Sequence, residues 1–263
     1  MPVAIGQELA LGARARTSSP SRPSRRRPFR PTPVEVTLFG AMRLCEGGTE
    51  RRPPLAAQRL LALVVLHGGR LRRRTATEVL WPHLSGAVAT GCLRSTLSRL
   101  RAISPGALIA GPGDLRLVPH AAVDVFEFER AALVALSGAG TDEDPARFAA
   151  ELLPEWDDDW VALERERLHE LGVHAIEAVA GRLSAEQRYA EAIAAAYRAV
   201  RLDPLRESAV RTLVAIHLAE GNRVRAARAY LDFRQRLRAA LGVEPSDALS
   251  SMITSMLPPA PTA

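Results

Sequence analysis

A third of the way along the chain the sequence reads Ala87-Val-Ala-Thr-Gly-Cys-Leu-Arg-Ser-Thr-Leu-Ser-Arg-Leu-Arg-Ala-Ile103. Within it, Leu93, Leu97 and Leu100 follow the i, i+4, i+7 spacing that places side chains on one face of a helix. Ser104 continues the same row. We therefore expect an amphipathic helix whose leucine stripe packs against the rest of the protein.

The opposite face of this helix is small and basic. At about 100° per residue, four small residues lie opposite the leucines, namely Gly91, Ser95, Ser98 and Ala102. Three arginines flank them: Arg94, Arg99 and Arg101. Such a face can lie close to a DNA groove and reach phosphates and base edges together. An ordinary solvated surface helix would show the same pattern, so the neighbouring segments must distinguish the two.

The segments around this helix predict a winged helix-turn-helix. Residues 34–52 alternate apolar and polar side chains, which indicates two or three short antiparallel strands. A helix is expected from about Pro54 to His67, where Gly68-Gly69 ends it. A hairpin follows the arginine-rich helix, with a tight turn at Gly111-Pro-Gly-Asp114. The order of sheet, helix, helix, turn, helix and hairpin is that of a helix-turn-helix with a β-hairpin wing.

The second helix of this motif is predicted to begin at Thr75. Thr75-Ala-Thr-Glu78 has the spacing of a capping box, in which the Thr and Glu side chains satisfy backbone N–H groups of the first turn. The helix must end before Pro82, because a proline ring prevents its continuation. Trp81, at the end of this leucine-containing helix, is expected to belong to the core.

From residue 121 onward the pattern is helical almost throughout. We expect a helix from Asp124 and further helices at about 160–183, 185–202, 205–219, 222–240 and 246–256. Tyr189-Ala-Glu-Ala-Ile-Ala-Ala-Ala-Tyr-Arg-Ala-Val-Arg-Leu-Asp-Pro204 resembles the second helix of a tetratricopeptide repeat, whose period is about 34 residues. Ala192 and Ala226 are 34 residues apart. Arrays of this kind build concave surfaces for protein partners.

Charge is distributed unevenly between the two halves. Residues 1–120 contain nineteen Arg and six acidic residues, a net charge of +13, whereas residues 121–263 have a net charge of −7. Every basic residue is Arg, which codon bias alone could explain, but such bias does not explain why acidic residues avoid the first half. The pattern indicates a polyanion-binding module joined to a module with another task. Two cysteines make no disulfide framework, and no apolar run is long enough to cross a membrane, so we expect a cytoplasmic protein.

At both ends of the chain, apolar residues show no regular spacing. Residues 1–33 are rich in Arg, Ser and Pro and are predicted to be a disordered basic arm, and residues 258–263 a disordered tail. The arm would add non-specific affinity for DNA. An over-called start codon, a dispensable tail or an organellar transit peptide would also explain its composition.

Several further groups were considered as sites. Arg70, Arg72, Arg73 and Arg74 precede the second helix and Thr75 opens it. A phosphate clamp and a solvated loop are both compatible with the sequence here. Asp157-Asp-Asp159 is better explained by helix capping than by a catalytic pair. His169 and His174 do not have the i, i+4 spacing of zinc ligands. A redox role for Cys92 has no support in the sequence. No metal, cofactor or enzyme activity is expected.

The chain as a whole resembles the SARP-type bacterial transcriptional activators, in which an OmpR/PhoB-like winged helix precedes a bacterial transcriptional activator domain. The resemblance covers roughly residues 34–256. In the first half it rests on Val36-Thr-Leu-Phe-Gly40, Glu78-Val-Leu-Trp-Pro82 and Leu93-Arg-Ser-Thr-Leu-Ser-Arg-Leu-Arg101. In the second half it rests on Tyr189-Ala-Glu-Ala192, Leu202-Asp-Pro-Leu-Arg-Glu207 and Leu241-Gly-Val-Glu-Pro-Ser246.

This resemblance implies a mainly α-helical protein with a winged-helix DNA-binding domain at 34–120 and a tetratricopeptide-like activator domain at 121–257. It implies sequence-specific binding to repeats upstream of promoters, with double-stranded DNA and RNA polymerase as partners. Because a single winged helix binds weakly, a second copy is also expected as a partner on such a site. The base-reading residues would be Arg94, Ser95 and Ser98, with Arg99 or Arg101. Arg116 on the wing would contact phosphate or the minor groove, although Asp114 at the wing tip would repel phosphate. A scaffold that binds proteins and not DNA is the alternative.

Overall fold

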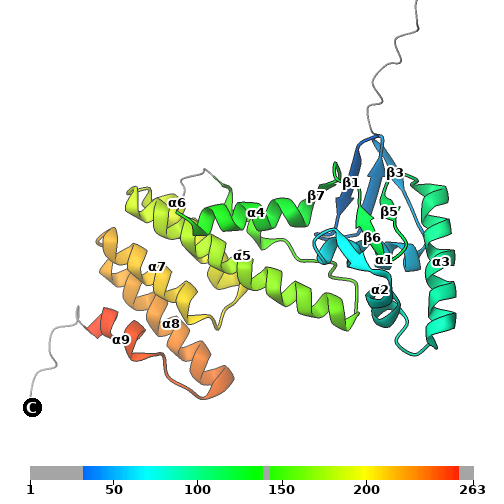
Figure 1. The fold of residues 1–263 in the computed structure, drawn as a ribbon. Coiled ribbons are helices and arrows are strands. Elements are labelled where there is room, and N and C mark those ends of the chain that lie inside the picture. Colours follow the sequence, from blue (N-terminus) through cyan, green and yellow to red (C-terminus); the bar gives the residue numbers. More distant parts are fainter. Residues whose placement is uncertain (1–31, 139–142, 255–263) are drawn as a thin grey trace, which may run out of the picture. The chain divides into compact units, whose positions relative to one another are not determined.

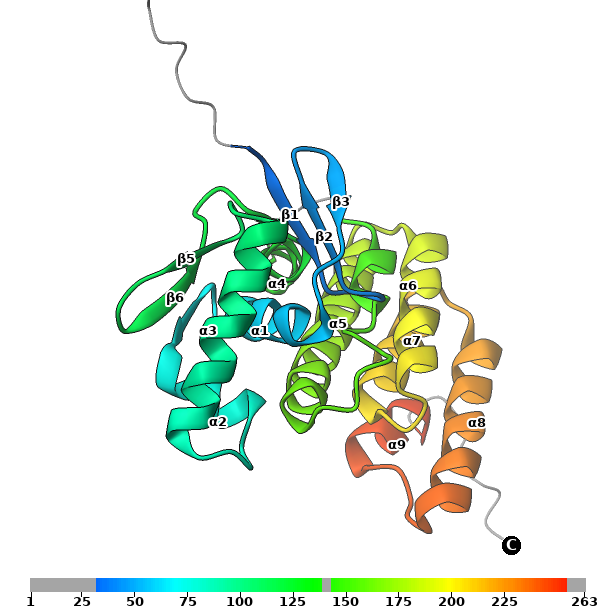
Figure 2. The ribbon, with the colours of Figure 1, turned by 90° about the vertical axis from the view of Figure 1, so that its right-hand side faces the viewer.

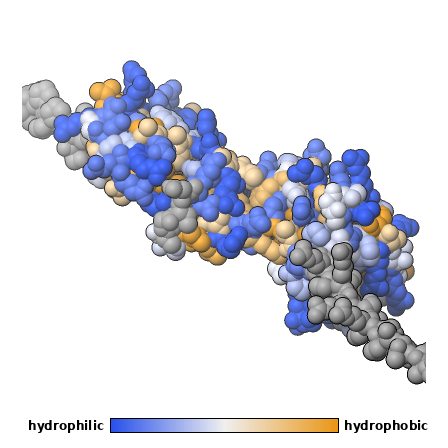
Figure 3. All heavy atoms as spheres, turned by 90° about the horizontal axis from the view of Figure 1, so that it is seen from above, coloured by the Kyte–Doolittle hydropathy of each residue, from blue (hydrophilic) through white to orange (hydrophobic). Residues whose placement is uncertain are grey.

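The computed structural model describes residues 32–138 and 143–254. The predicted tail at 258–263, and all but the last two residues of the predicted arm at 1–33, lie outside these ranges. On the face shown in Figure 3, hydrophilic residues dominate and apolar residues form small patches among them. In the described ranges, no helix is both long enough and apolar enough to cross a membrane.

The first three strands pair as their alternation predicts. They form an antiparallel meander of β1 (Val34–Thr37), β2 (Arg43–Glu46) and β3 (Thr49–Arg51). Val34, Val36 and Leu44 point into the core. A further strand, β7 (Ala122–Val123), lies parallel to β1, so the sheet order is β3-β2-β1-β7. The sequence did not predict β7, because two residues are too few to show an alternation.

Three helices and a second sheet complete the predicted winged helix-turn-helix. The helices are α1 (Leu55–Leu66), α2 (Arg73–Leu80) and α3 (Gly86–Ile103). The second sheet has the order β4-β6-β5, made of β4 (Arg70–Arg72), β6 (Asp114–Leu117) and β5 (Leu108–Ala110). Figure 2 shows α3 facing the viewer with the β5–β6 hairpin beside it. Strand β4 was not predicted. Trp81 is half-buried and packs against the core.

The predicted capping box at the start of α2 is wrong. The helix begins at Arg73 and not at Thr75, and its N-cap residue Arg72 makes no side-chain capping hydrogen bond. The reason is the pairing of β4 with β6, which brings the chain against the wing before the helix starts. The backbone N–H of Arg73 donates to the carbonyl of Gly113 at 3.1 Å. A donor of the first turn is therefore satisfied by the wing, and Thr75 lies inside the helix.

The second half is the predicted helical array. Its elements are α4 (Asp124–Leu136), the short 3₁₀ helix η1 (Pro145–Ala149), α5 (Asp159–Ala185), α6 (Tyr189–Leu202), α7 (Glu207–Ala219), α8 (Arg223–Leu241) and α9 (Asp247–Thr254). From α5 to α8, each helix packs on the next (Figure 1). Ala192 and Ala226 are fully buried at these contacts, as their spacing suggests. The helix predicted at 185–202 begins later because α5 runs to Ala185 and Gln187 then turns the chain with a φ of 62°.

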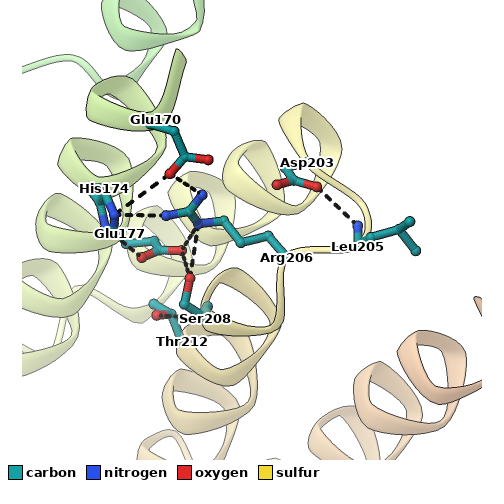
Figure 4. A network of polar contacts seen from close by, with 8 residues as sticks. All are labelled: Glu170, His174, Glu177, Asp203, Leu205, Arg206, Ser208 and Thr212. Atoms are coloured by element: carbon teal, nitrogen blue, oxygen red, sulfur yellow. Dashed lines mark hydrogen bonds and ion pairs between the residues drawn. The ribbon is translucent and has the colours of Figure 1, made fainter. Parts of the chain in front are cut away.

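A polar network ties α5 to the turn before α7. Arg206 donates from Nη1 to Glu170 at 2.7 Å and from Nη2 to Nε2 of His174 at 2.8 Å. Its Nε donates to the hydroxyl of Ser208, which itself donates to Glu177 (Figure 4). The hydrogen bond from Arg206 is the main cause that holds the pKa of Glu170 below its ordinary value. His174 thus belongs to a structural network of the array.

Asp124 connects the first sheet to the first helix of the array. Its Oδ2 accepts hydrogen bonds from the backbone N–H groups of Leu38 and Phe39, each at 2.8 Å. Its Oδ1 accepts from the N–H of Val125, also at 2.8 Å. Burial raises the pKa of the Asp124 carboxyl, and these backbone hydrogen bonds oppose that rise. One carboxylate therefore satisfies donors at the end of β1 and at the start of α4.

Candidate nucleic-acid interface

The inner face of α3 fixes which of its residues reach solvent. Leu93, Leu97 and Leu100 are buried, as the spacing predicted, and so is Ser104 after the helix. Thr96 is buried as well. With this face held in the core, the opposite face of the helix must point outward.

The outer face of α3 carries all five of its residues that the sequence predicted to contact DNA. They are exposed: Arg94, Ser95, Ser98, Arg99 and Arg101. None of the three arginines makes an ion pair with a described residue. Gly91 is also exposed, and a Cβ added there would meet no atom within 4 Å. The small residues on this face are therefore not required by packing inside the described part of the protein.

The predicted clamp at the start of α2 divides into residues with different tasks. Arg72 is exposed and has no side-chain partner in the described ranges. Arg73 donates from Nε to the carbonyl of Gly111 at 2.8 Å, so it holds the wing. Arg74 is exposed and pairs with Glu78 at 2.7 Å. Thr75 is half-buried in the first turn. Arg72 is therefore the only one of these three arginines without a side-chain partner in the described ranges.

On the wing, Asp114 is neutralised by its neighbours. Arg70 and Arg116, which face each other across β4 and β6, both donate to Oδ2 of Asp114, at 3.0 and 2.9 Å. The hydrogen bond from Arg116 is the main cause that lowers the pKa of Asp114. The expected repulsion between this acid and phosphate is therefore offset by two exposed guanidinium groups.

Sequence reasoning placed Arg70 in the clamp before the second helix and not on the wing, and it did not single out Ile109. Arg70 belongs to β4, which was not predicted, and Ile109 lies opposite Arg116 in the β5–β6 pair. Ile109 is exposed, although it is a large apolar residue on a strand. The alternation of Leu108, Ile109 and Ala110 hinted at this exposure, but three residues are too few to assign faces.

The structure also places the other residues that the sequence analysis considered as sites. The capping predicted for Asp157-Asp-Asp159 is wrong at the N-cap position of α5. Asp158 occupies that position without a side-chain capping hydrogen bond, and its carboxylate pairs instead with Arg59 of α1. Asp159 lies in the first turn of the helix. Cys92 is a half-buried free cysteine on α3. Among residues 32–138 and 143–254, no three His, Cys, Asp or Glu side chains are grouped so that they could hold a metal ion.

Comparison with known proteins identifies the second half. The profile of the family described as "Bacterial transcriptional activator domain" matches residues 123–257, which is more than half of the chain. The solved structure of Mycobacterium tuberculosis EmbR in complex with a low affinity phosphopeptide is similar in fold, with a TM-score of 0.67 and 22% sequence identity. The similarity covers 86% of this chain and 66% of the EmbR chain, so this sequence spans less than two thirds of that protein. No curated protein matches the sequence. The chain belongs to the bacterial transcriptional activator domain family, as its resemblance to the SARP-type activators implied.

Proposed function

We propose that the protein binds double-stranded DNA in a sequence-specific way through residues 34–120 and activates transcription through residues 121–257. The observation that carries this proposal is the outer face of α3. It presents Arg94, Arg99 and Arg101 without partners among the described residues, beside small side chains that let the helix approach a surface closely. An α-helix of this kind fits the major groove of B-DNA.

The proposed role of each residue, base contact or phosphate contact, follows from its position. Ser95 and Ser98 lie at the centre of the exposed face, and Arg94 lies at its side. These three residues are proposed to contact base edges, with Arg99 or Arg101. Arginine is well suited to this task because its fork of donors matches the acceptors of guanine. Arg70 and Arg72 on β4 and Arg116 on β6 are proposed to contact phosphates, which fixes the register of the protein on the duplex.

The activator domain is proposed to contact RNA polymerase or a second copy of the chain. One winged helix covers few base pairs, so typical specific affinities of about 10⁻⁸–10⁻¹¹ M call for cooperating copies on a repeated site. A protein with this task acts in the cytoplasm, where bacterial DNA and polymerase are found.

Fluorescence anisotropy of the purified protein tests DNA binding. The probe is labelled DNA from the upstream neighbourhood of its own gene, compared with a scrambled duplex over a salt series. Binding to one sequence that persists at high salt is expected. Equal and steeply salt-sensitive binding to both duplexes would show that residues 34–120 are only a basic surface that binds DNA non-specifically, because non-specific binding is mainly driven by counterion release. That result would favour the protein-binding scaffold.

A further inference from the structure

Helix α8 is a basic element in an otherwise acidic part of the chain. Residues 121–222 contain ten Arg and twenty acidic residues, whereas α8 contains six Arg and one Asp. Two of these arginines, Arg234 and Arg238, pair with Glu244 after the helix. The first half of α8 is different, because Arg223, Arg225 and Arg228 have no side-chain partner in the described part of the chain.

The outer face of α8 combines these free charges with exposed apolar side chains. Ala226, Phe233 and Leu237 are buried and fix the inner face of the helix. Val224 and Leu231, two turns apart on the other side, are 70% and 54% exposed. Arg225 and Arg228 lie between them and are exposed too. This helix face, termed the α8 strip, has no covering element among the described residues.

The beginning of α5 also combines an exposed apolar side chain with free charges, but these charges are negative. Leu163 is 72% exposed, and Asp159 and Glu166 lie one turn before and one turn after it. Neither acid has an ion pair or side-chain hydrogen bond within the described ranges, and both are exposed. The arginines nearby are engaged elsewhere: Arg165 with backbone carbonyls and Glu151, and Arg167 with Glu129 and Glu164. Asp159, Leu163 and Glu166 are termed the α5 patch.

The two surfaces match in both charge and apolar content. Leu163 and Val224 are the most exposed large apolar residues in the described part of the protein, and each is surrounded by free charges of one sign. Burial of such side chains from water is favourable, and unpaired charges of opposite sign set the partner and the register. Both ribbon views draw the start of α5 apart from α8, so one chain does not bring its own two surfaces together (Figures 1 and 2).

We infer that the α8 strip of one copy docks on the α5 patch of a second copy. A DNA duplex would satisfy the arginines but would leave Val224 and Leu231 facing a polar backbone, whereas the α5 patch offers an apolar centre and acidic flanks. Because the two surfaces differ, the contact is head-to-tail and leaves one surface open at each end. Copies bound side by side on repeated DNA sites would then contact one another in a single direction. The contact itself does not need DNA.

Sedimentation velocity of the full chain without DNA tests this association. At low salt, the weight-average mass of the wild-type protein is expected to rise with concentration beyond that of a dimer. High salt should lower the mass, because exposed charges are screened. Arg225→Glu with Arg228→Glu should weaken association by about tenfold or more. The matched control is Arg201→Glu with Arg211→Glu, which changes the net charge equally on exposed residues of α6 and α7 and should leave association unchanged.

A charge swap identifies the surface that α8 binds. Asp159→Arg with Glu166→Arg should also weaken association when the variant is alone. Mixed in equal amounts, this variant and the α8 variant should associate again, because each altered surface then meets its complement. Recovery also shows that both variants are folded. A wild-type chain that stays monomeric at all concentrations, or a mixture that stays monomeric, would overturn the proposal. Since no DNA is present, these outcomes are independent of the test of DNA binding.

Discussion

Arg73 donates its Nε–H to the backbone carbonyl of Gly111 at 2.8 Å, and so joins the first turn of α2 to the tip of the wing. A second bond reinforces the link, from the backbone N–H of Arg73 to the carbonyl of Gly113. The arginine that the sequence placed in a phosphate clamp therefore sets the position of the wing. Its neighbour Arg72 points into solvent without a partner among the described residues.

Replacing these two neighbours should separate stability from DNA contact. Arg73→Ala is expected to cost about 1–3 kcal/mol, because a hydrogen bond from a charged donor is lost and the Gly111 carbonyl loses its partner. Amide hydrogen exchange should quicken at residues 111–116. Arg72→Ala should leave exchange there unchanged and weaken binding to all duplexes alike. The assignment is wrong if Arg72→Ala, and not Arg73→Ala, releases the wing.

Arg94→Ala should weaken binding to the target sequence by about 1–3 kcal/mol and relax its preference over scrambled DNA. Arg94 is exposed on α3 and contributes to no described ion pair, so the fold should not respond. Anisotropy titrations with target and scrambled duplexes measure both effects, with Arg201→Ala as a control of equal charge. Unchanged affinity for the target would remove Arg94 from the group of base-reading residues.

Removal of residues 1–31 should weaken binding to every DNA sequence by a similar factor. These residues contain seven Arg and one acidic residue, and charge neutralisation of phosphates carries no sequence information. The slope of log affinity against log salt should become shallower. A changed preference among sequences would instead show that the arm reads DNA, and unchanged binding would show that it is dispensable.

Arg206→Ala should lower the stability of the helical array by about 1–3 kcal/mol at neutral pH, since Glu170 loses its hydrogen-bond donor and Glu177 loses an ion-pair partner. Arg206 lowers the pKa of Glu170 in the folded protein. The wild type therefore gains stability above the pKa that Glu170 has in the unfolded chain, and loses it as the pH falls through the lower folded value.

The difference in unfolding free energy between wild type and Arg206→Ala should accordingly shrink in acid. Urea unfolding at neutral and acidic pH measures it. Glu155→Ala, at an exposed acid outside the network, is a control expected to have a small effect at each pH. A difference that stays constant down to acidic pH would show that the Arg206–Glu170 pair contributes nothing.

The sequence by itself determined the elements in which apolar residues are regularly spaced. Regular spacing reveals a buried face in three places: the leucines of α3, the alternation of β1, and Ala192 and Ala226. Burial of apolar side chains dominates the choice of structure there. The exposed face of α3 followed from helix geometry alone, which is why all five of its residues predicted to contact DNA are exposed.

Only the tertiary structure decided the short strands and the partners of polar groups. β4 and β7 span three and two residues, and they exist because β6 and β1 offer unpaired backbone groups beside them. The start of α2, the neutralisation of Asp114 and the three bonds to Asp124 depend in the same way on residues distant in the chain. A local pattern cannot show such contacts, because hydrogen bonding needs two groups to meet in space and leaves no periodicity in either segment.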